Sequence, residues 1–161
     1  MNKDLSQLQQ DDYSIDGHKV HYHLDRVYQW SIADEMEDKI QVYPIYVEVS
    51  PVGYCNHRCS FCAVDYLGYV NKKIETFSLK NAILSMACNG VRSIMYAGEG
   101  EPLLHPDINE IVNWTAKNGI DVGITTNGTA LAEKFVLSSL EYCTWVKVLE
   151  LIDVLVIWIK K

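Results

Sequence analysis

Three cysteines carry the clearest chemical signal in this sequence. Cys55, Cys59 and Cys62 lie within eight residues, in a loop that also contains Pro51 and Gly53. Thiolates at this spacing can converge on one small group, and three of them leave one iron of a four-iron cube without a protein ligand. An iron with an open position permits cofactor or substrate chemistry. The spacing therefore predicts a [4Fe–4S] site suited to catalysis rather than to plain electron transfer.

A zinc site is the alternative interpretation of the same loop. Structural zinc takes four protein ligands, and His57 or Cys88 could supply the fourth. On that interpretation the chain is a zinc-binding interaction module. Three more histidines, His18, His21 and His23, also lie close together, but in a short polar stretch we expect them to be solvated surface residues.

The cysteine loop resembles the signature of the radical S-adenosylmethionine (SAM) superfamily, which has three cysteines at this spacing and an aromatic residue, here Phe61, before the last. The resemblance covers about residues 45–148. It implies that Cys55, Cys59 and Cys62 ligate a [4Fe–4S] cluster and that Phe61 packs near the cofactor. It also implies that SAM is cleaved to a 5′-deoxyadenosyl radical, which abstracts hydrogen from an unknown substrate, and that a flavodoxin or ferredoxin donates the electron.

Two further motifs fit this resemblance. The run Gly98-Glu99-Gly100-Glu101-Pro102 resembles the family's Gly-Gly-Glu-Pro stretch, which holds the amino group of SAM. Aligned on the proline, Glu101 takes the place of the family's glutamate, whereas Glu99 stands where glycine is usual. The run Thr125-Thr126-Asn127-Gly128 resembles a stretch near the cofactor, which implies that Asn127 hydrogen-bonds SAM. Both runs also fit ordinary turns.

Alternating strand and helix patterns organise these motifs. Runs of β-branched and aromatic residues predict strands at 45–49, 93–97, 121–125 and 145–149. Helices are expected at 79–89, 106–119 and 130–140, the first capped by Ser78. Because the alternation favours parallel strands, the cysteine loop, Glu101 and Asn127 should meet at the carboxyl ends of the strands. The strands are apolar along their length, so we expect both faces of the sheet to be covered.

The expected fold class is α/β: a partial (βα) barrel of parallel strands, with about three to four βα units and an N-terminal peripheral segment. We divide the chain into a peripheral segment at 1–42, a cluster-binding core at 43–148 and an apolar tail at 149–161. A helix is expected around residues 27–39. Cys88 and Cys143 should be small buried apolar groups, and His105 should mark a helix start without a catalytic role.

The tail departs from the resemblance. A complete family barrel has more βα units than this chain, so the barrel should stay unclosed, with an exposed strand edge that favours self-association. Lys147, Glu150 and Asp153 recur every three residues, as on one face of a helix, among apolar β-branched residues. We expect an altered or truncated ending of a longer gene. A catalytically inactive cluster-binding fragment is therefore an alternative to an active enzyme.

Composition excludes some classes of function. The 161 residues carry a net charge of −7, and residues 1–40, with four basic and nine acidic side chains, hold −5 of it. An acidic chain without a stripe of Lys and Arg argues against non-specific nucleic-acid binding. The amino terminus lacks the apolar core of a secretory signal, and residues 146–159 are too few to span a bilayer. We therefore expect a cytoplasmic protein without membrane association, in which the cysteines are ligands or free thiols.

Overall fold

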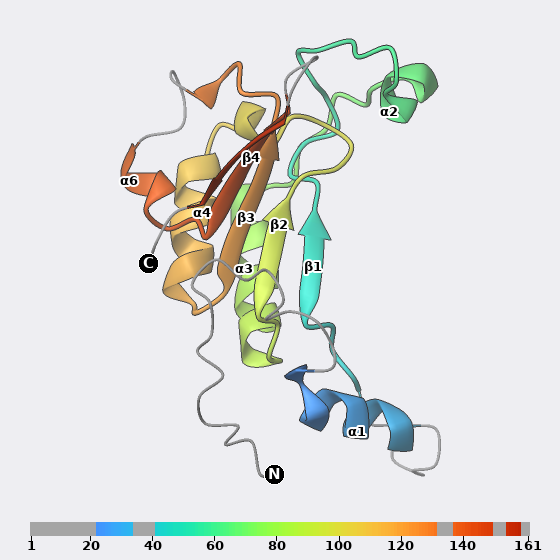
Figure 1. Ribbon diagram of the computed structural model, residues 1–161, viewed down its shortest axis with the longest axis vertical. Helices are drawn as coiled ribbons and strands as arrows, with labels where there is room; N and C mark the ends of the chain where they lie inside the picture. Colours follow the sequence, from blue (N-terminus) through green and yellow to red (C-terminus); the bar gives the residue numbers. More distant parts are fainter. Residues whose placement is uncertain (1–21, 34–40, 132–136, 150–153, 159–161) are drawn as a thin grey trace, which may run out of the picture.

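A five-stranded sheet forms the centre of the protein (Figure 1). The computed structural model describes residues 22–33, 41–131, 137–149 and 154–158. The strands lie side by side in chain order: β1 (Tyr46–Val49), β2 (Ser93–Tyr96), β3 (Asp121–Thr126), β4 (Trp145–Leu149) and β5 (Val154–Trp158). The first four are parallel and β5 is antiparallel to β4. The predicted α/β class with parallel strands is confirmed.

Helices precede the first strand and separate the parallel strands in the chain, and two of them pack on one face of the sheet. The helices are α1 (Leu24–Ile32), α2 (Ala63–Leu67), α3 (Thr76–Cys88), the short 3₁₀ helix η4 (Pro102–Leu104), α4 (Ile108–Lys117) and α6 (Leu137–Leu140). Figure 1 shows α3 and α4 together behind β2 and β3, with α2 above the sheet and α1 below it. Arg26 of α1 donates hydrogen bonds to the carbonyls of Asn89 and Gly90, which attaches α1 to the end of α3.

Buried and half-buried residues alternate in β2 and β4, whereas residues 122–124 of β3 are all buried, so the expected cover on both faces is present only in part. In β2, Ile94 and Tyr96 are buried, whereas Ser93 and Met95 are only half-buried. The buried side chains face the helices and join one apolar core with residues of α3 and α4. The Tyr96 hydroxyl lies 2.6 Å from that of Thr115 within this core. A sheet packed on one face leaves the other face available for a ligand or another part of a protein.

Two helix starts differ from the predictions. Helix α3 begins at Thr76 rather than at Leu79, and its cap is Glu75, whose carboxylate accepts from the backbone N–H of Ser78. Ser78 is therefore a donor to the cap and not the cap itself. Helix α4 begins at Ile108 rather than at Pro106, and the separate short helix η4 ends before it at Leu104. Helices α3 and α4 both end before a glycine with positive φ, as predicted, which closes the turn at little steric cost.

His105 is buried between η4 and α4, and its ring is held at both nitrogens. Nδ1 accepts from the N–H of Asp107 at 3.2 Å, so Nε2 carries the proton and donates to the carbonyl of Ile74 at 2.9 Å. The histidine therefore ties the start of α4 to the segment before α3. This placement agrees with the predicted structural role for His105.

The tail forms a strand where its charge spacing suggested a helix. Residues 154–158 pair antiparallel with β4, from Leu149 opposite Val154 to Trp145 opposite Trp158. The β-branched and aromatic composition of this stretch suits a strand and outweighs a three-residue charge period. Glu150 and Asp153 lie outside the described residues.

Several other predictions have mixed outcomes. Cys143 is fully buried as expected, but Cys88 is exposed, because it lies on the outer side of the last turn of α3. The helix expected at 27–39 is α1, which ends at Ile32, and residues 34–40 lie outside the described part. His18 and His21 also lie outside the described part, as do residues 132–136 of the helix expected at 130–140. Among the described residues, no helix is long and apolar enough to cross a membrane.

Candidate cofactor site

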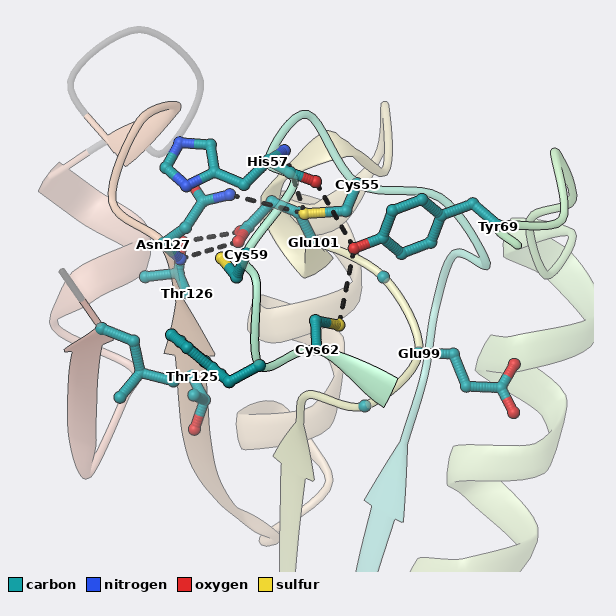
Figure 2. A pocket seen from close by; sticks show the side chains of 14 residues that line it. Cys55, His57, Cys59, Cys62, Tyr69, Glu99, Glu101, Thr125, Thr126 and Asn127 are labelled. Carbon is teal, nitrogen blue, oxygen red and sulfur yellow. Dashed lines mark hydrogen bonds between the residues drawn. The ribbon is translucent and has the colours of Figure 1, made fainter. Parts of the chain in front are cut away.

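Three loops meet where the parallel strands end, as the sequence predicts. The cysteine loop follows β1, the Gly98–Pro102 run follows β2, and Asn127 follows β3 directly. Together they line a cavity of about 540 Å³, drawn in Figure 2. All six residues predicted for the site line this cavity: Cys55, Cys59, Phe61, Cys62, Glu101 and Asn127. The volume lies in the range of small-molecule sites.

Glu101 joins two of these loops through its carboxylate. The side chain is only 3% exposed. Its Oε1 accepts from the Leu103 N–H at 3.0 Å and from the Thr126 hydroxyl at 2.6 Å. Its Oε2 accepts from the Asn127 N–H at 2.7 Å. Because a carboxylate offers about four lone-pair positions, Oε2 keeps one for a further donor in the cavity.

Gly100 allows this loop to lie directly against the backbone that leads to the cysteines. A Cβ at Gly100 would lie 2.4 Å from the carbonyl oxygen of Tyr54 and 2.5 Å from that of Val52. The adjacent Glu101 N–H donates to the same Tyr54 carbonyl at 3.0 Å. Only glycine fits at this contact, so the position of the Cys55 backbone depends on the loop after β2.

Asn127 connects the end of β3 to the cysteine loop. Its Nδ2 lies 2.8 Å from Oδ1 of Asn56, to which it donates, and 3.7 Å from the sulfur of Cys55. Its Oδ1 accepts from the Thr129 N–H, which is an Asn turn. A second link joins the same loops, since Nε2 of His57 lies 2.8 Å from the Thr129 hydroxyl.

The three cysteine sulfurs are half-buried around the cavity and are held differently. The sulfur of Cys55 lies 3.3 Å from the backbone N–H of His57. The backbone N–H of Asp65 and the Tyr69 hydroxyl lower the pKa of the Cys62 thiol, because both stabilise its thiolate. No hydrogen bond to the Cys59 sulfur occurs among the described residues.

Tyr69 is a site residue that the sequence reasoning missed. It lines the cavity, and its hydroxyl lies 3.6 Å from the sulfur of Cys62. No motif marks this residue, because it is seven positions beyond the last cysteine in the long connection at residues 63–77. Only the pairing of that stretch with residues 51–53 brings it back to the loop.

The remaining predicted residues differ in how they face the cavity. Phe61 lies on the rim and is 77% exposed. Glu99 is also at the rim, but Figure 2 shows its carboxylate pointing away from the cysteine sulfurs. Glu101 is therefore buried where the loops after β2 and β3 meet, whereas the Glu99 carboxylate points away from the cysteines.

The donor set fits an iron–sulfur cluster better than a single metal ion. The cysteine loop brings three thiols to the cavity. A structural zinc site needs four protein ligands around one point. Three soft thiolates spread around a cavity instead suit a multi-atom iron–sulfur cube. The adjacent carboxylate and amide suit the cationic ammonium and polar groups of SAM.

Comparison with known proteins identifies relatives for the same part of the chain. The family model of the radical SAM superfamily matches residues 49–149. A GTP 3′,8-cyclase from Chlorobaculum tepidum is 40% identical over 88 residues, which are 53% of this chain and 26% of that protein. The chain spans about a quarter to a third of the length of the curated cyclases that it matches.

Solved structures share the fold. A crystal structure of Streptococcus suis SuiB bound to its precursor peptide SuiA superposes with a TM-score of 0.58 at 20% identity, covering 79% of this chain and 27% of SuiB. BtrN in complex with AdoMet and 2-DOIA gives a TM-score of 0.54 at 22% identity, covering 66% of this chain and 46% of BtrN. The match over residues 49–149 and the shared fold show that this chain belongs to the radical SAM superfamily, whose enzymes use a [4Fe–4S] cluster and S-adenosylmethionine.

Proposed function

We propose that this chain is the cofactor-binding part of a radical SAM enzyme, in which Cys55, Cys59 and Cys62 hold the cluster. The observation that carries the proposal is the convergence of three cysteines, a buried carboxylate and an amide on one cavity at the carboxyl ends of parallel strands. Cluster and SAM, when bound, supply one-electron cleavage of the sulfonium and a 5′-deoxyadenosyl radical that abstracts hydrogen. The division into parts at 1–42, 43–148 and 149–161 stays a prediction.

The chain's own residues then have distinct tasks toward SAM. Glu101 offers the free lone pair of Oε2 to the ammonium group, while its other hydrogen bonds hold it in place. Asn127 hydrogen-bonds the cofactor from the neighbouring loop, with its amide exchanging its present bond to Asn56 or to the Cys55 sulfur for one to SAM. Phe61, on the rim, offers an apolar ring against which the bound cofactor packs. Holding these groups before SAM arrives reduces the cost of ordering them on binding.

The proposal includes an electron donor such as a flavodoxin or a ferredoxin. For the unknown substrate, we propose only that a hydrogen atom is abstracted from it. The cyclase relatives act on GTP by name, but the alignments cover only 26–29% of those proteins, and the part of this chain that the radical SAM family model matches is residues 49–149. Cleavage of SAM is the step that this part supports.

Anaerobic reconstitution tests the proposal. The chain is incubated with iron and sulfide, desalted, and analysed for iron, acid-labile sulfide and absorbance. Dithionite and SAM are then added, and 5′-deoxyadenosine is measured. We expect about four irons and four sulfides per chain, the composition of a [4Fe–4S] cluster, together with 5′-deoxyadenosine that depends on the reductant.

Other outcomes separate the alternatives. A cluster without 5′-deoxyadenosine indicates an inactive cluster-binding fragment. One zinc per chain without labile sulfide in anaerobically purified protein indicates the zinc-binding module. Exposed Cys88 provides the matched control, because Cys88→Ala should leave both iron content and SAM cleavage unchanged.

A further inference from the structure

We propose that Tyr69 tunes the cluster by donating a hydrogen bond to the sulfur of Cys62, which raises the reduction potential of the bound cluster. The inference rests on the proposed function and adds a positioning residue to it. It starts from one contact: the Tyr69 hydroxyl lies 3.6 Å from the Cys62 sulfur at the edge of the cavity (Figure 2).

The backbone places Tyr69 beside the cysteine loop. The Val70 N–H donates to the carbonyl of Gly53 at 2.8 Å, and the Gly53 N–H donates to the carbonyl of Lys72 at 2.9 Å. The Val52–Lys73 bridge extends this antiparallel pairing. Gly68, with φ of 92°, permits the sharp turn out of α2 that begins the return. Tyr69 is consequently half-buried between two exposed neighbours.

Residues of the cysteine loop also hold the Tyr69 ring. The guanidinium of Arg58 lies over the Tyr69 ring, 5.2 Å from its centroid, and is paired with the carboxylate of Asp65. The Tyr69 hydroxyl lies 3.4 Å from the carbonyl of His57. These contacts fix the hydroxyl between the middle and the end of the cysteine loop, so its distance to the Cys62 sulfur is set by several elements.

Once Cys62 is a cluster ligand, only Tyr69 can be the donor in the hydrogen bond between the two side chains. A thiol could donate to the tyrosine oxygen, but a ligating cysteine has lost its proton. The only proton left in the contact is that of the tyrosine, which remains neutral at pH 7. Of its two acceptors, the anionic sulfur is favoured over the His57 carbonyl, because hydrogen bonds to charged acceptors are stronger.

Such a bond affects the cluster's potential. Reduction adds one electron to the cluster, and negative charge increases on its sulfur ligands. A donor to a ligand sulfur stabilises that charge and raises the potential. Loss of the donor should therefore make the cluster harder to reduce.

The test is a redox titration of the reconstituted chain, with dithionite supplying the electron and EPR detecting the reduced cluster. Tyr69→Phe removes only the hydroxyl. We expect its potential to become more negative, by roughly the 59 mV that a tenfold change in a one-electron equilibrium represents. Tyr66→Phe is the matched control, because Tyr66 is 91% exposed in the adjacent helix and should give the wild-type potential.

Each result decides the inference. A Tyr69→Phe cluster with the wild-type potential and EPR spectrum overturns it. If Tyr69→Phe yields no cluster, Tyr69→His, which restores a ring N–H donor, should recover iron; failure to recover it would assign Tyr69 a packing role and overturn the inference. If the wild-type chain binds no iron after reconstitution, the proposed function itself is refuted. The Tyr69 variants would then show the same lack of iron as the wild type.

Discussion

The two sides of the cavity are built differently. On one side, Glu101 is almost fully buried and accepts three hydrogen bonds from the loops after β2 and β3. On the other side, the stretch from Cys59 to Phe61 is exposed or half-buried and makes few contacts with the rest of the fold. The carboxylate side is thus fixed by the protein itself, whereas the stretch from Cys59 to Phe61 lacks comparable support.

This difference separates the roles of protein and cofactor in ordering the site. A network with every buried acceptor satisfied is rigid before any ligand binds. A loop held by few contacts loses its conformational entropy only when metal binds, and part of the binding free energy then offsets that loss. We therefore expect the SAM side of the cavity to be preorganised and the stretch from Cys59 to Phe61 to become ordered with the cluster. Four substitutions test this comparison.

Cys59→Ala should have the largest effect, on cofactor content. Without this thiolate only two cysteine ligands remain, so reconstituted iron should fall from about four per chain to near zero. Metal analysis after desalting measures it, and Cys88→Ala is the control. The fold of the apoprotein should be unchanged by circular dichroism, because the Cys59 sulfur has no hydrogen-bond partner among the described residues. Retained iron would contradict the ligand assignment.

Glu101→Ala should have the largest effect on stability of the apoprotein. It leaves the buried donors of Leu103, Thr126 and Asn127 without their acceptor, which should cost roughly 3 kcal/mol in the free energy of unfolding. Urea denaturation measures this cost. The exposed Glu99→Ala variant should change stability by no more than about 0.5 kcal/mol. If Glu101→Ala and Glu99→Ala lowered the free energy of unfolding equally, the buried carboxylate of Glu101 would not be what fixes its side of the cavity.

Gly100→Ala should have an intermediate effect. The new Cβ would press on the carbonyls of Val52 and Tyr54, and relief of the overlap should cost roughly 1–3 kcal/mol. Because the shift passes to the segment before Cys55, cluster yield should fall together with stability. Gly119→Ala is a useful contrast: its Cβ meets no atom within 4 Å, so only its positive φ is strained and cluster yield should be unaffected.

Asn56→Ala should have the smallest effect. Asn56 is exposed, and its Oδ1 accepts from Asn127 across the two sides of the cavity at 2.8 Å. We expect a loss of about 0.5–1 kcal/mol in unfolding free energy. The same variant should leave SAM cleavage within twofold of wild type, because Glu101 still holds the backbone of Asn127. A loss as large as that of Glu101→Ala would show that the cysteine side also supports the apoprotein.

Local patterns were enough to predict much of this fold. The strands at 46–49, 93–96, 121–126 and 145–149 carry β-branched runs, and the glycines at 90 and 119 mark helix ends, so short-range signals identified them. The meeting of Cys55, Glu101 and Asn127 followed from strand direction alone, because parallel strands bring the loops at their carboxyl ends to one edge.

Long-range contacts could not be predicted in this way. Tyr69 approaches Cys62 only because residues 70–74 pair with 51–53, and no periodicity encodes that pairing. The carboxylate of Glu101 was identified by motif, but its bond to the Thr126 hydroxyl spans 25 positions of sequence. The strand β5 was misread because a charge period in a short segment is weaker than β-branched composition.

The antiparallel direction of β5 sets the polarity of the sheet's last edge. Trp158 pairs with Trp145, so β5 finishes beside the beginning of β4, at the end of the sheet remote from the cavity. The four parallel strands all run toward the end of the sheet that holds the cavity, whereas β5 runs away from that end. The hairpin also occupies the backbone donors and acceptors of β4 that a fifth parallel neighbour would require. Continuing the barrel beyond β4 would therefore require β5 to be displaced first.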